Sequence, residues 1–193
     1  MRRCLRPRRD LTPPWHAFLG ALDDRVDEPI ALHCIGGFVV SLLYGLPRPT
    51  GDVDVASVVP AHVAARLVAL AGRGSDLHNR YGVFLQIVTV ATLPEDYSTR
   101  LTEMFPGAFD RLTLFAPDPY DLALSKIERN VDQDIEDVKH LARVVPLDLA
   151  QLRRRYEQEL RPYLGRPERE DLTLQLWIDA IAEERAGPGR PTA

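Results

Sequence analysis

Residues 34–55 read CIGGFVVSLLYGLPRPTGDVDV, and this stretch decides the fold. The apolar run over 30–35 stops at Gly36 and Gly37, which is typical of a buried strand that ends in a tight turn. The apolar residues after the glycine pair predict a short helix over 38–44, closed by the next glycine along the chain. A strand, a glycine pair and a helix therefore follow one another directly.

The helix is followed by a proline-containing loop and then by a strand that begins with two acids. Two prolines exclude a helix over 46–51, and the apolar pattern over 52–59 predicts a strand. Because residues two apart in a strand project on the same face, Asp52 and Asp54 should lie side by side while Val53 faces the core. Two carboxylates so placed repel each other unless a cation lies between them, and hard oxygen ligands suit Mg²⁺ or Mn²⁺. The sequence thus predicts a divalent metal site at these two acids.

The glycine pair lies where a ligand could approach the backbone. Gly36 and Gly37 have no side chains, so their amides can come close to a ligand, and the N-terminus of the following helix favours an anion. Glycines that hold a polyphosphate, beside carboxylates that hold its metal, are typical of phosphoryl or nucleotidyl transfer. Arg48 would either steer a phosphate or neutralise Asp52 when no metal is bound. Each motif alone usually marks an ordinary turn, and it is their order that favours a site.

The rest of the chain divides into an alternating part and a helical part. Helices and strands alternate over 1–117, which predicts an α/β core with an N-terminal helix, and a helical region over 118–186 and a flexible tail over 187–193 follow. The segment richest in β-forming residues, 81–90, should be a central strand. The other expected elements are helices after Pro14 and over 61–71, 120–145, 147–164 and 168–184, and a strand over 111–116.

Composition bounds the class of protein. The chain has 193 residues, of which 45% are hydrophobic and 27% charged, so it can bury a core and is not a low-complexity chain. Because the formal net charge is -4, any contact with nucleic acid must be local. Cys4 and Cys34 are too few for a disulfide framework or a zinc site. With no apolar run of roughly 20 residues and no apolar block of a signal peptide, we expect a cytoplasmic protein without a membrane partner.

The stretch 34–55 resembles the Gly-Gly…Asp-x-Asp signature of the polymerase β-like nucleotidyltransferase superfamily. It looks most like the branch of MenT and AbiEii type toxins and related DUF6036-like nucleotidyltransferases. The segment PYDLALSK at 119–126, followed by DIED at 134–137, is similar to the lysine helix and later Asp-x-x-Asp of that family. The resemblance covers about 30–145 and implies a polymerase β-like α/β core with a mixed sheet, followed by a C-terminal helical bundle.

The resemblance implies a Mg²⁺-dependent enzyme that moves a nucleoside monophosphate from an NTP to an acceptor hydroxyl. In the toxin branch the acceptor is the 3′ end of tRNA, so tRNA or another RNA and an antitoxin protein are the implied partners. Carried over residue by residue, the implied catalytic residues are Asp52, Asp54, Lys126 and Asp137. The implied nucleotide-binding residues are Gly36, Gly37, Arg48, Thr50, Lys126 and Asp134. Lys126 would contact the phosphates with Asp134 or Asp137 supporting it, and Thr50 lies where such toxins can be phosphorylated by the antitoxin.

The lysine segment has other interpretations when its residues are taken alone. On one helix over 120–145, the polar residues of one stripe are Lys126, Asn130, Asp134 and Asp137. That pattern alone favours a solvated face with ordinary salt bridges. Alternatively, Asn130 or Asp132 caps a second helix, which would reorient both aspartates.

One feature of the superfamily is missing. Its members generally carry a third carboxylate on the next core strand, whereas here the strand over 83–90 has no acid, and Gln86 cannot act as a base. Either one metal suffices, or Asp76 or Glu95 contributes from a flanking loop, or the domain binds nucleotide without turnover. Positioning and charge neutralisation do most of the work in phosphoryl transfer, so one metal can suffice. We favour this outcome because members of the toxin branch that the chain resembles often have a reduced set of acids.

Two other functions stay open. Transfer of AMP to a small molecule such as an aminoglycoside would need an acidic cleft, whereas an RNA acceptor would need clustered arginines. A catalytically silent nucleotide-binding module is favoured by the missing third acid.

Overall fold

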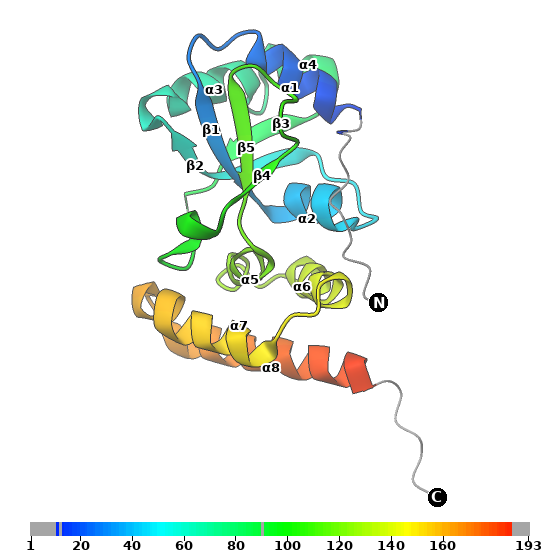
Figure 1. Cartoon of the computed structure of the whole chain (residues 1–193), viewed down its shortest axis with the longest axis vertical. Helices are drawn as coiled ribbons and strands as arrows, with labels where there is room; N and C mark the ends of the chain where they lie inside the picture. Colours follow the sequence, from blue (N-terminus) through cyan, green and yellow to red (C-terminus); the bar gives the residue numbers. More distant parts are fainter. Residues whose placement is uncertain (1–10, 12, 90, 187–193) are drawn as a thin grey trace, which may run out of the picture. The chain divides into compact units, whose positions relative to one another are not determined.

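The structure is a computed structural model that describes residues 11, 13–89 and 91–186 (Figure 1). The chain forms two compact units. The first comprises the residues up to Ala91 together with Tyr97–Asp118, and the second comprises Thr92–Asp96 and the residues from Pro119 onward. The predicted tail over 187–193 lies outside the described residues.

The first unit is built on a mixed five-stranded sheet, as predicted. Its strands are β1 (Ile30–Ile35), β2 (Asp52–Val59), β3 (Phe84–Ile87), β4 (Thr102–Met104) and β5 (Leu112–Ala116), in the order β3-β2-β1-β5-β4. β1 pairs antiparallel with β2 and parallel with β5, while β2–β3 is parallel and β4–β5 antiparallel. β1 and β2 are therefore antiparallel neighbours in the sheet, although a helix separates them in sequence.

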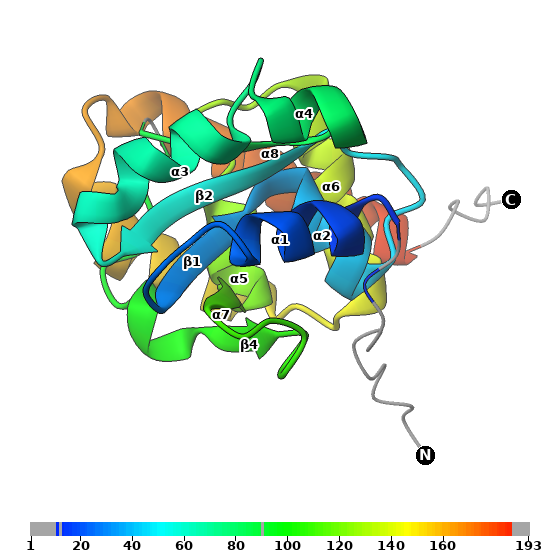
Figure 2. The same cartoon turned by 90° about the horizontal axis from the view of Figure 1, so that it is seen from above.

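Helices of this unit cover one face of the sheet (Figure 2). They are α1 (Trp15–Asp23), α3 (Ala64–Ala71) and α4 (Asp76–Tyr81), and α2 (Gly36–Tyr44) contacts β1 and β2. The fully buried side chains of this core include Phe18, Leu22, Leu32, Leu67, Leu77 and Leu85. This packing fixes which face of β2 is buried, and hence which face presents the two aspartates.

A bulge in β2 maintains that division between the two faces. His33 pairs with Ser57 whereas Cys34 pairs with Val55, so β2 carries one extra residue at this point. The extra residue shifts the alternation by one. The valines that β2 buries most deeply are Val53, Val55 and Val58. On the opposite face, Asp54 before the bulge and Ser57 after it lie on the same side of the sheet.

The prediction of a central strand over 81–90 was wrong. The strand covers only Phe84–Ile87, and it lies at the edge of the sheet. Tyr81 instead ends α4, which Ser75 caps by accepting a hydrogen bond from the His78 amide. Gly82, with φ of 72°, terminates the helix in the left-handed conformation. The segment is rich in β-forming residues because the short strand buries Phe84 and Leu85, not because it is central.

Asp23 fastens the start of β5 to the end of α1. Its buried carboxylate accepts hydrogen bonds from the amides of Asp110, Arg111 and Leu112 at 3.0, 2.8 and 2.7 Å. Hydrogen bonds to a buried charged group stabilise more than neutral ones, and their loss leaves amides without a partner. Three hydrogen bonds to one acid at the end of α1 thus help to hold the start of β5 in place.

The second unit is helical. Its helices are α5 (Pro119–Leu124), α6 (Asp132–Val144), α7 (Leu149–Arg155) and α8 (Pro167–Ala186), with a π-type turn over Tyr156–Leu160 after α7. Thr92–Asp96 joins this unit, since the Thr92 amide donates to Glu128 Oε2 at 2.9 Å and the Glu95 amide donates to the Glu159 carbonyl at 2.9 Å. In the described ranges, no helix has the length and apolarity needed to cross a bilayer.

The prediction of a single helix over 120–145 was wrong. The chain leaves the helical conformation between Leu124 and Asp132, and Asn130 has a φ of 42°. The alternative of a second helix is correct, but neither of the residues considered for its cap supplies it. Asp134, in the first turn of α6, accepts a hydrogen bond from the Val131 amide at 3.1 Å.

We predict that Asp23→Ala lowers the free energy of unfolding by at least about 2 kcal/mol, because three backbone amides lose a charged acceptor. Urea titration followed by circular dichroism measures the change. Asp24→Ala is the matched control, since Asp24 is exposed, and it should cost less than about 0.5 kcal/mol. Equal effects of the two substitutions would contradict this role of Asp23.

Candidate functional site

The candidate site in the first unit begins where β1 turns into α2. Gly36 is the first residue of α2 and has a φ of 72°, a conformation that L-residues with a side chain rarely adopt. A Cβ placed on Gly36 would overlap the carboxylate of Asp54. The backbone at the start of α2 therefore lies directly against that carboxylate, and only glycine permits both the turn and the approach.

The N-terminus of α2 has no side-chain cap from the residue that precedes it. That residue, Ile35, makes no side-chain hydrogen bond to the first turn of the nine-residue helix. Helix N-termini carry partial positive charge and unpaired amides, so they bind phosphate groups readily. The first turn of α2 can thus serve the anion-binding role predicted for the glycine pair.

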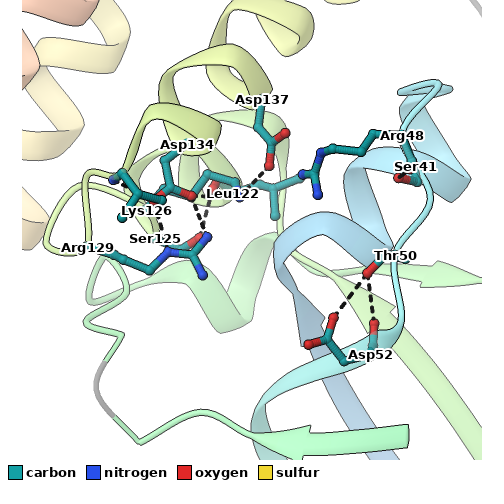
Figure 3. Close-up of polar contacts among 11 residues, drawn as sticks. Ser41, Arg48, Thr50, Asp52, Leu122, Ser125, Lys126, Arg129, Asp134 and Asp137 are labelled. Carbon is teal, nitrogen blue, oxygen red and sulfur yellow. Dashed lines mark hydrogen bonds and ion pairs between the residues drawn. The ribbon is translucent and has the colours of Figure 1, made fainter. Parts of the chain in front are cut away.

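Gly37 lies beside two polar side chains of the loop that follows α2. A Cβ on Gly37 would be 3.5 Å from Arg48 Nη2 and 3.6 Å from Thr50 Oγ1, which is ordinary contact. The loop is held near the helix because Ser41 Oγ donates to the Arg48 carbonyl at 2.9 Å (Figure 3). The guanidinium of Arg48 therefore lies at the N-terminal end of α2, on the same side as Thr50.

Thr50 orients Asp52. Its hydroxyl donates to Asp52 Oδ1 at 3.1 Å or to the Asp52 carbonyl at 3.2 Å, as the dashed lines in Figure 3 show. Asp52 and Asp54 are both half-buried, while Val53 between them is fully buried, which is the alternation expected of a strand. The two aspartates therefore share the face of β2 opposite the helices of the core.

Cys34 shows how close Asp54 lies to β1. The register pairs Ile35 with Asp54, so Cys34 is the next residue along β1. Burial raises the pKa of the Cys34 thiol, and the negative charge of Asp54 raises that pKa further. The raised pKa and the burial of this thiol disfavour a thiolate at neutral pH.

Gln86 stands opposite Asp54. The parallel register of β2 and β3 pairs these two residues directly, so their side chains lie on the same face of the sheet. An amide thus occupies the neighbouring strand position at which a further acid would lie next to Asp54. Among the described residues, no cluster of three or more histidine, cysteine or acidic side chains is arranged to hold a metal ion.

Neither of the two acids considered as substitutes lies on β3. Asp76 is in the first turn of α4. Glu95 belongs to the second unit, where a hydrogen bond from the hydroxyl of Tyr163 to Glu95 is the main cause of the raised pKa of that tyrosine. The participation of either acid stays a prediction.

The lysine motif forms a buried ion cluster in the second unit (Figure 3). Lys126 Nζ lies 2.8 Å from Asp137 Oδ2 and 3.4 Å from Asp134 Oδ1, and the lysine side chain is only 3% exposed. Both aspartates are also buried. The structure thus brings the three predicted residues together, although it does so through the break between α5 and α6 and not along one helical stripe.

Arg129, which was not predicted from the sequence, completes this cluster. Its guanidinium binds Asp134 in a two-pronged arrangement, with Nε 2.9 Å from Oδ2 and Nη2 2.6 Å from Oδ1. The two cations and two carboxylates have no net charge. The Arg129 side chain is 59% exposed, so it presents its charge to solvent while Lys126 does not. Neighbours on one face of a continuous helix are three or four residues apart, so the spacing of five between Arg129 and Asp134 did not indicate a contact.

The pKa of Asp134 reflects these contacts. Burial alone would raise its pKa, but the hydrogen bonds from Arg129, the charge of Lys126 and the amide of Val131 outweigh burial and hold the pKa below its ordinary value of 3.8. The carboxylate is therefore charged at neutral pH and acts as the centre of the cluster. Whether Lys126, Asp134 and Asp137 contact a nucleotide stays a prediction.

A protein-family comparison matches residues 17–182 to the family described as nucleotidyltransferase of unknown function (DUF6036). The chain belongs to this family of nucleotidyltransferases. The match covers most of the chain. It includes Gly36, Gly37, Asp52 and Asp54, which we call the glycine–aspartate site, and the buried ion cluster around Lys126. Comparisons with curated proteins and with solved structures give no match.

We predict that Gly36→Ala destabilises the first unit by about 1–3 kcal/mol. The left-handed backbone conformation is strained for alanine, and the added Cβ would displace the Asp54 carboxylate. Urea denaturation measures this loss. Gly37→Ala is the matched control: its Cβ would make only ordinary contacts, and the cost should stay below about 0.5 kcal/mol. A larger effect at Gly37 than at Gly36 would contradict the geometry.

We predict that Asp134→Asn destabilises the protein by about 1–3 kcal/mol at neutral pH and by progressively less as the pH falls below 3.8. The folded-state pKa lies below the unfolded one, so the carboxylate stabilises the protein fully above the unfolded pKa and this contribution is lost as the pH falls through the folded value. Urea titrations from neutral to acidic pH measure the difference from the native sequence.

The exposed neighbour Asp132 provides the control for this experiment. Asp132→Asn should change the free energy of unfolding by less than about 1 kcal/mol at each pH. A difference between Asp134→Asn and the native sequence that stays constant or grows on acidification would refute the role assigned to the carboxylate.

Proposed function

We propose that the protein is a Mg²⁺-dependent enzyme that transfers a nucleoside monophosphate from an NTP to a hydroxyl of RNA, with the 3′ end of tRNA as the first candidate acceptor. One observation carries the proposal. Asp54 lies against the backbone of Gly36 at the N-terminus of α2, and Asp52 shares its face of β2. Carboxylates that can hold a metal ion thus lie close to backbone amides that can bind a polyphosphate.

The donor set at this point fits Mg²⁺. Magnesium is commonly bound through one or two carboxylates together with water and substrate phosphates, so Asp52 and Asp54 suffice as protein ligands. Carboxylate oxygens also favour it over softer metals, and Cys34, the cysteine among the described residues, is buried with a raised pKa. A magnesium ion held there would supply neutralisation of the charge on the triphosphate.

The side chains around the two acids have distinct tasks in this proposal. Thr50 holds Asp52 in one orientation by donating its hydroxyl hydrogen bond. The first-turn amides of α2 bind a phosphate oxygen, and Arg48, whose guanidinium lies beside Gly37, donates to the same anion. Together these groups orient the NTP, which is the main contribution that a protein makes to phosphoryl transfer.

The RNA acceptor and the toxin role rest on the resemblance of residues 34–55 to the toxin branch. In that reading an antitoxin protein controls the enzyme. Thr50 is a suitable point of control, because a phosphoryl group on its hydroxyl would place roughly two negative charges next to Asp52. Such a charge would compete with the NTP for the metal and for the N-terminus of α2.

A second candidate function is nucleotide binding without turnover. Gln86, directly opposite Asp54 on β3, is the observation that favours it, because an amide cannot accept the proton of an attacking hydroxyl. Binding of an NTP with Mg²⁺ would then use the same acids and the same helix N-terminus, and only the transfer step would be missing.

We predict that Asp52→Asn and Asp54→Asn each reduce transfer of labelled nucleotide to total tRNA by at least about a hundredfold, the loss typical of removing one electrostatic stabiliser from an active site. The assay uses each of the four α-labelled NTPs with Mg²⁺. Glu103→Gln, which changes an exposed acid on β4, is the control and should keep full activity. Urea midpoints show whether the variants stay folded.

The identity of the labelled product separates the candidate functions. Labelled tRNA supports the RNA acceptor, and label on an added aminoglycoside supports small-molecule transfer. Binding of NTP without any labelled product, measured by calorimetry, supports the silent module. Full transfer activity in Asp52→Asn or Asp54→Asn would remove the metal site from the mechanism.

A further inference from the structure

The longest helix of the second unit, α8, has an exposed apolar stripe. Its buried side, formed by Glu170, Thr173, Leu174, Trp177 and Ile181, packs into the unit. On the opposite side, the side chains of Leu172 and Leu176 are 61% and 55% exposed. Two large apolar side chains one turn apart on a helix are neighbours, so they form a continuous exposed apolar patch. Apolar residues scattered singly over a surface form no such patch.

Charged residues extend this stripe in both directions. Positions 169, 172, 176, 179 and 183 follow spacings of three and four, so they lie on one face of the helix. All five are exposed. The stripe therefore has Arg169 at its N-terminal end, the two leucines in the middle, and Asp179 and Glu183 at its C-terminal end. We call these five residues the α8 stripe.

We infer that the α8 stripe pairs with the same stripe of a second copy of the chain, with the two helices antiparallel across a two-fold axis. Such an axis near residue 174 places Leu172 against Leu176 of the second copy. It also places Arg169 opposite Asp179 of the second copy, and the symmetry makes each of these contacts twice. A parallel pair would instead place Arg169 against its own equivalent, so charge selects the antiparallel arrangement.

The neighbouring charges agree with this register. Glu168, also exposed, faces the uncharged Ala180 of the second copy, and Arg166 lies near Glu183 of the second copy. Arg169 is already bound to Glu170 and to the Glu128 carbonyl, and these contacts hold its side chain in place. The side chain is still 64% exposed, so its charge remains accessible to solvent. Asp179 accepts a hydrogen bond from Gln175 at 2.7 Å and is also exposed.

The size of the stripe sets the strength of the pair. One helix pair with two leucines from each copy buries less than the roughly 1,200 Å² of a standard stable interface, so a reversible dimer is expected. This inference is independent of the nucleotide chemistry, since none of the residues involved belongs to the glycine–aspartate site.

Sedimentation velocity over a wide concentration series tests the inference. The full chain should shift reversibly from monomer to dimer, and Leu172→Glu or Asp179→Arg should raise the dimer dissociation constant by at least tenfold. The matched controls are Val68→Glu, at an apolar residue of α3 that is 45% exposed, and Glu157→Arg, at an exposed acid outside α8. Both controls should dimerise like the native sequence, and urea titrations verify that every variant is folded.

Cysteine cross-linking tests the register. In a Cys4→Ser background, an equimolar mixture of Leu172→Cys and Leu176→Cys should form a disulfide-linked dimer under mild oxidation faster than either variant alone. A chain that stays monomeric at every concentration, or a dimer that Leu172→Glu leaves intact, would overturn the inference. Cross-linking that is fastest within Leu172→Cys alone would overturn the antiparallel register.

Discussion

The contact between the backbone of Gly36 and the carboxylate of Asp54 is the constraint on which the first unit depends. A strand that turns into a helix without a loop needs a residue in the left-handed conformation, and the neighbouring strand brings a carboxylate to the same place. Both demands exclude a side chain at this position. The turn that makes the fold possible is thus the turn that brings an acid to the start of α2.

The faces of β2 are fixed by the burial of its valines. Val53 and Val55 are fully buried, so the acids that alternate with them must lie on the other face, and the bulge near Ala56 lets the burial continue to Val58. A slip of one residue would bury two carboxylates, at a cost far above the gain from any single contact. The hydrophobic core therefore determines the place of the two aspartates as firmly as any polar contact does.

Local patterns were enough to predict this half of the site. Strand, glycine pair, helix and strand follow from residues adjacent in sequence, and each was found where it was expected. Contacts between distant residues were harder to predict. The strand at Phe84 was placed at the centre of the sheet because its composition does not reveal its neighbours, and the three-residue strand β4 gave no periodic signal.

The helical half shows the same limit. The periodicity over 120–145 continues across a break that Asn130 makes with its positive φ, so a single helix was predicted. At this break, Asp134 accepts hydrogen bonds from the Val131 amide, from Arg129 and from Lys126. No spacing rule for a regular helix describes that combination of contacts, and Arg129 was therefore missed while Lys126, Asp134 and Asp137 were found through the family resemblance.

The distribution of cations bears on how this chain can bind a polyphosphate. The chain has only two lysines, and each is paired with carboxylates: Lys126 with Asp134 and Asp137 inside the second unit, and Lys139 with Glu136 at 3.1 Å. Within the first unit, an anion at the glycine turn would meet the planar guanidinium group of Arg48 and backbone amides. Such donors are fixed in direction, so they select an anion by its geometry as well as its charge. Arg48 beside Gly37, together with the first turn of α2, is an arrangement of this kind, and its selectivity would follow from the same turn that allows Gly36 to touch Asp54.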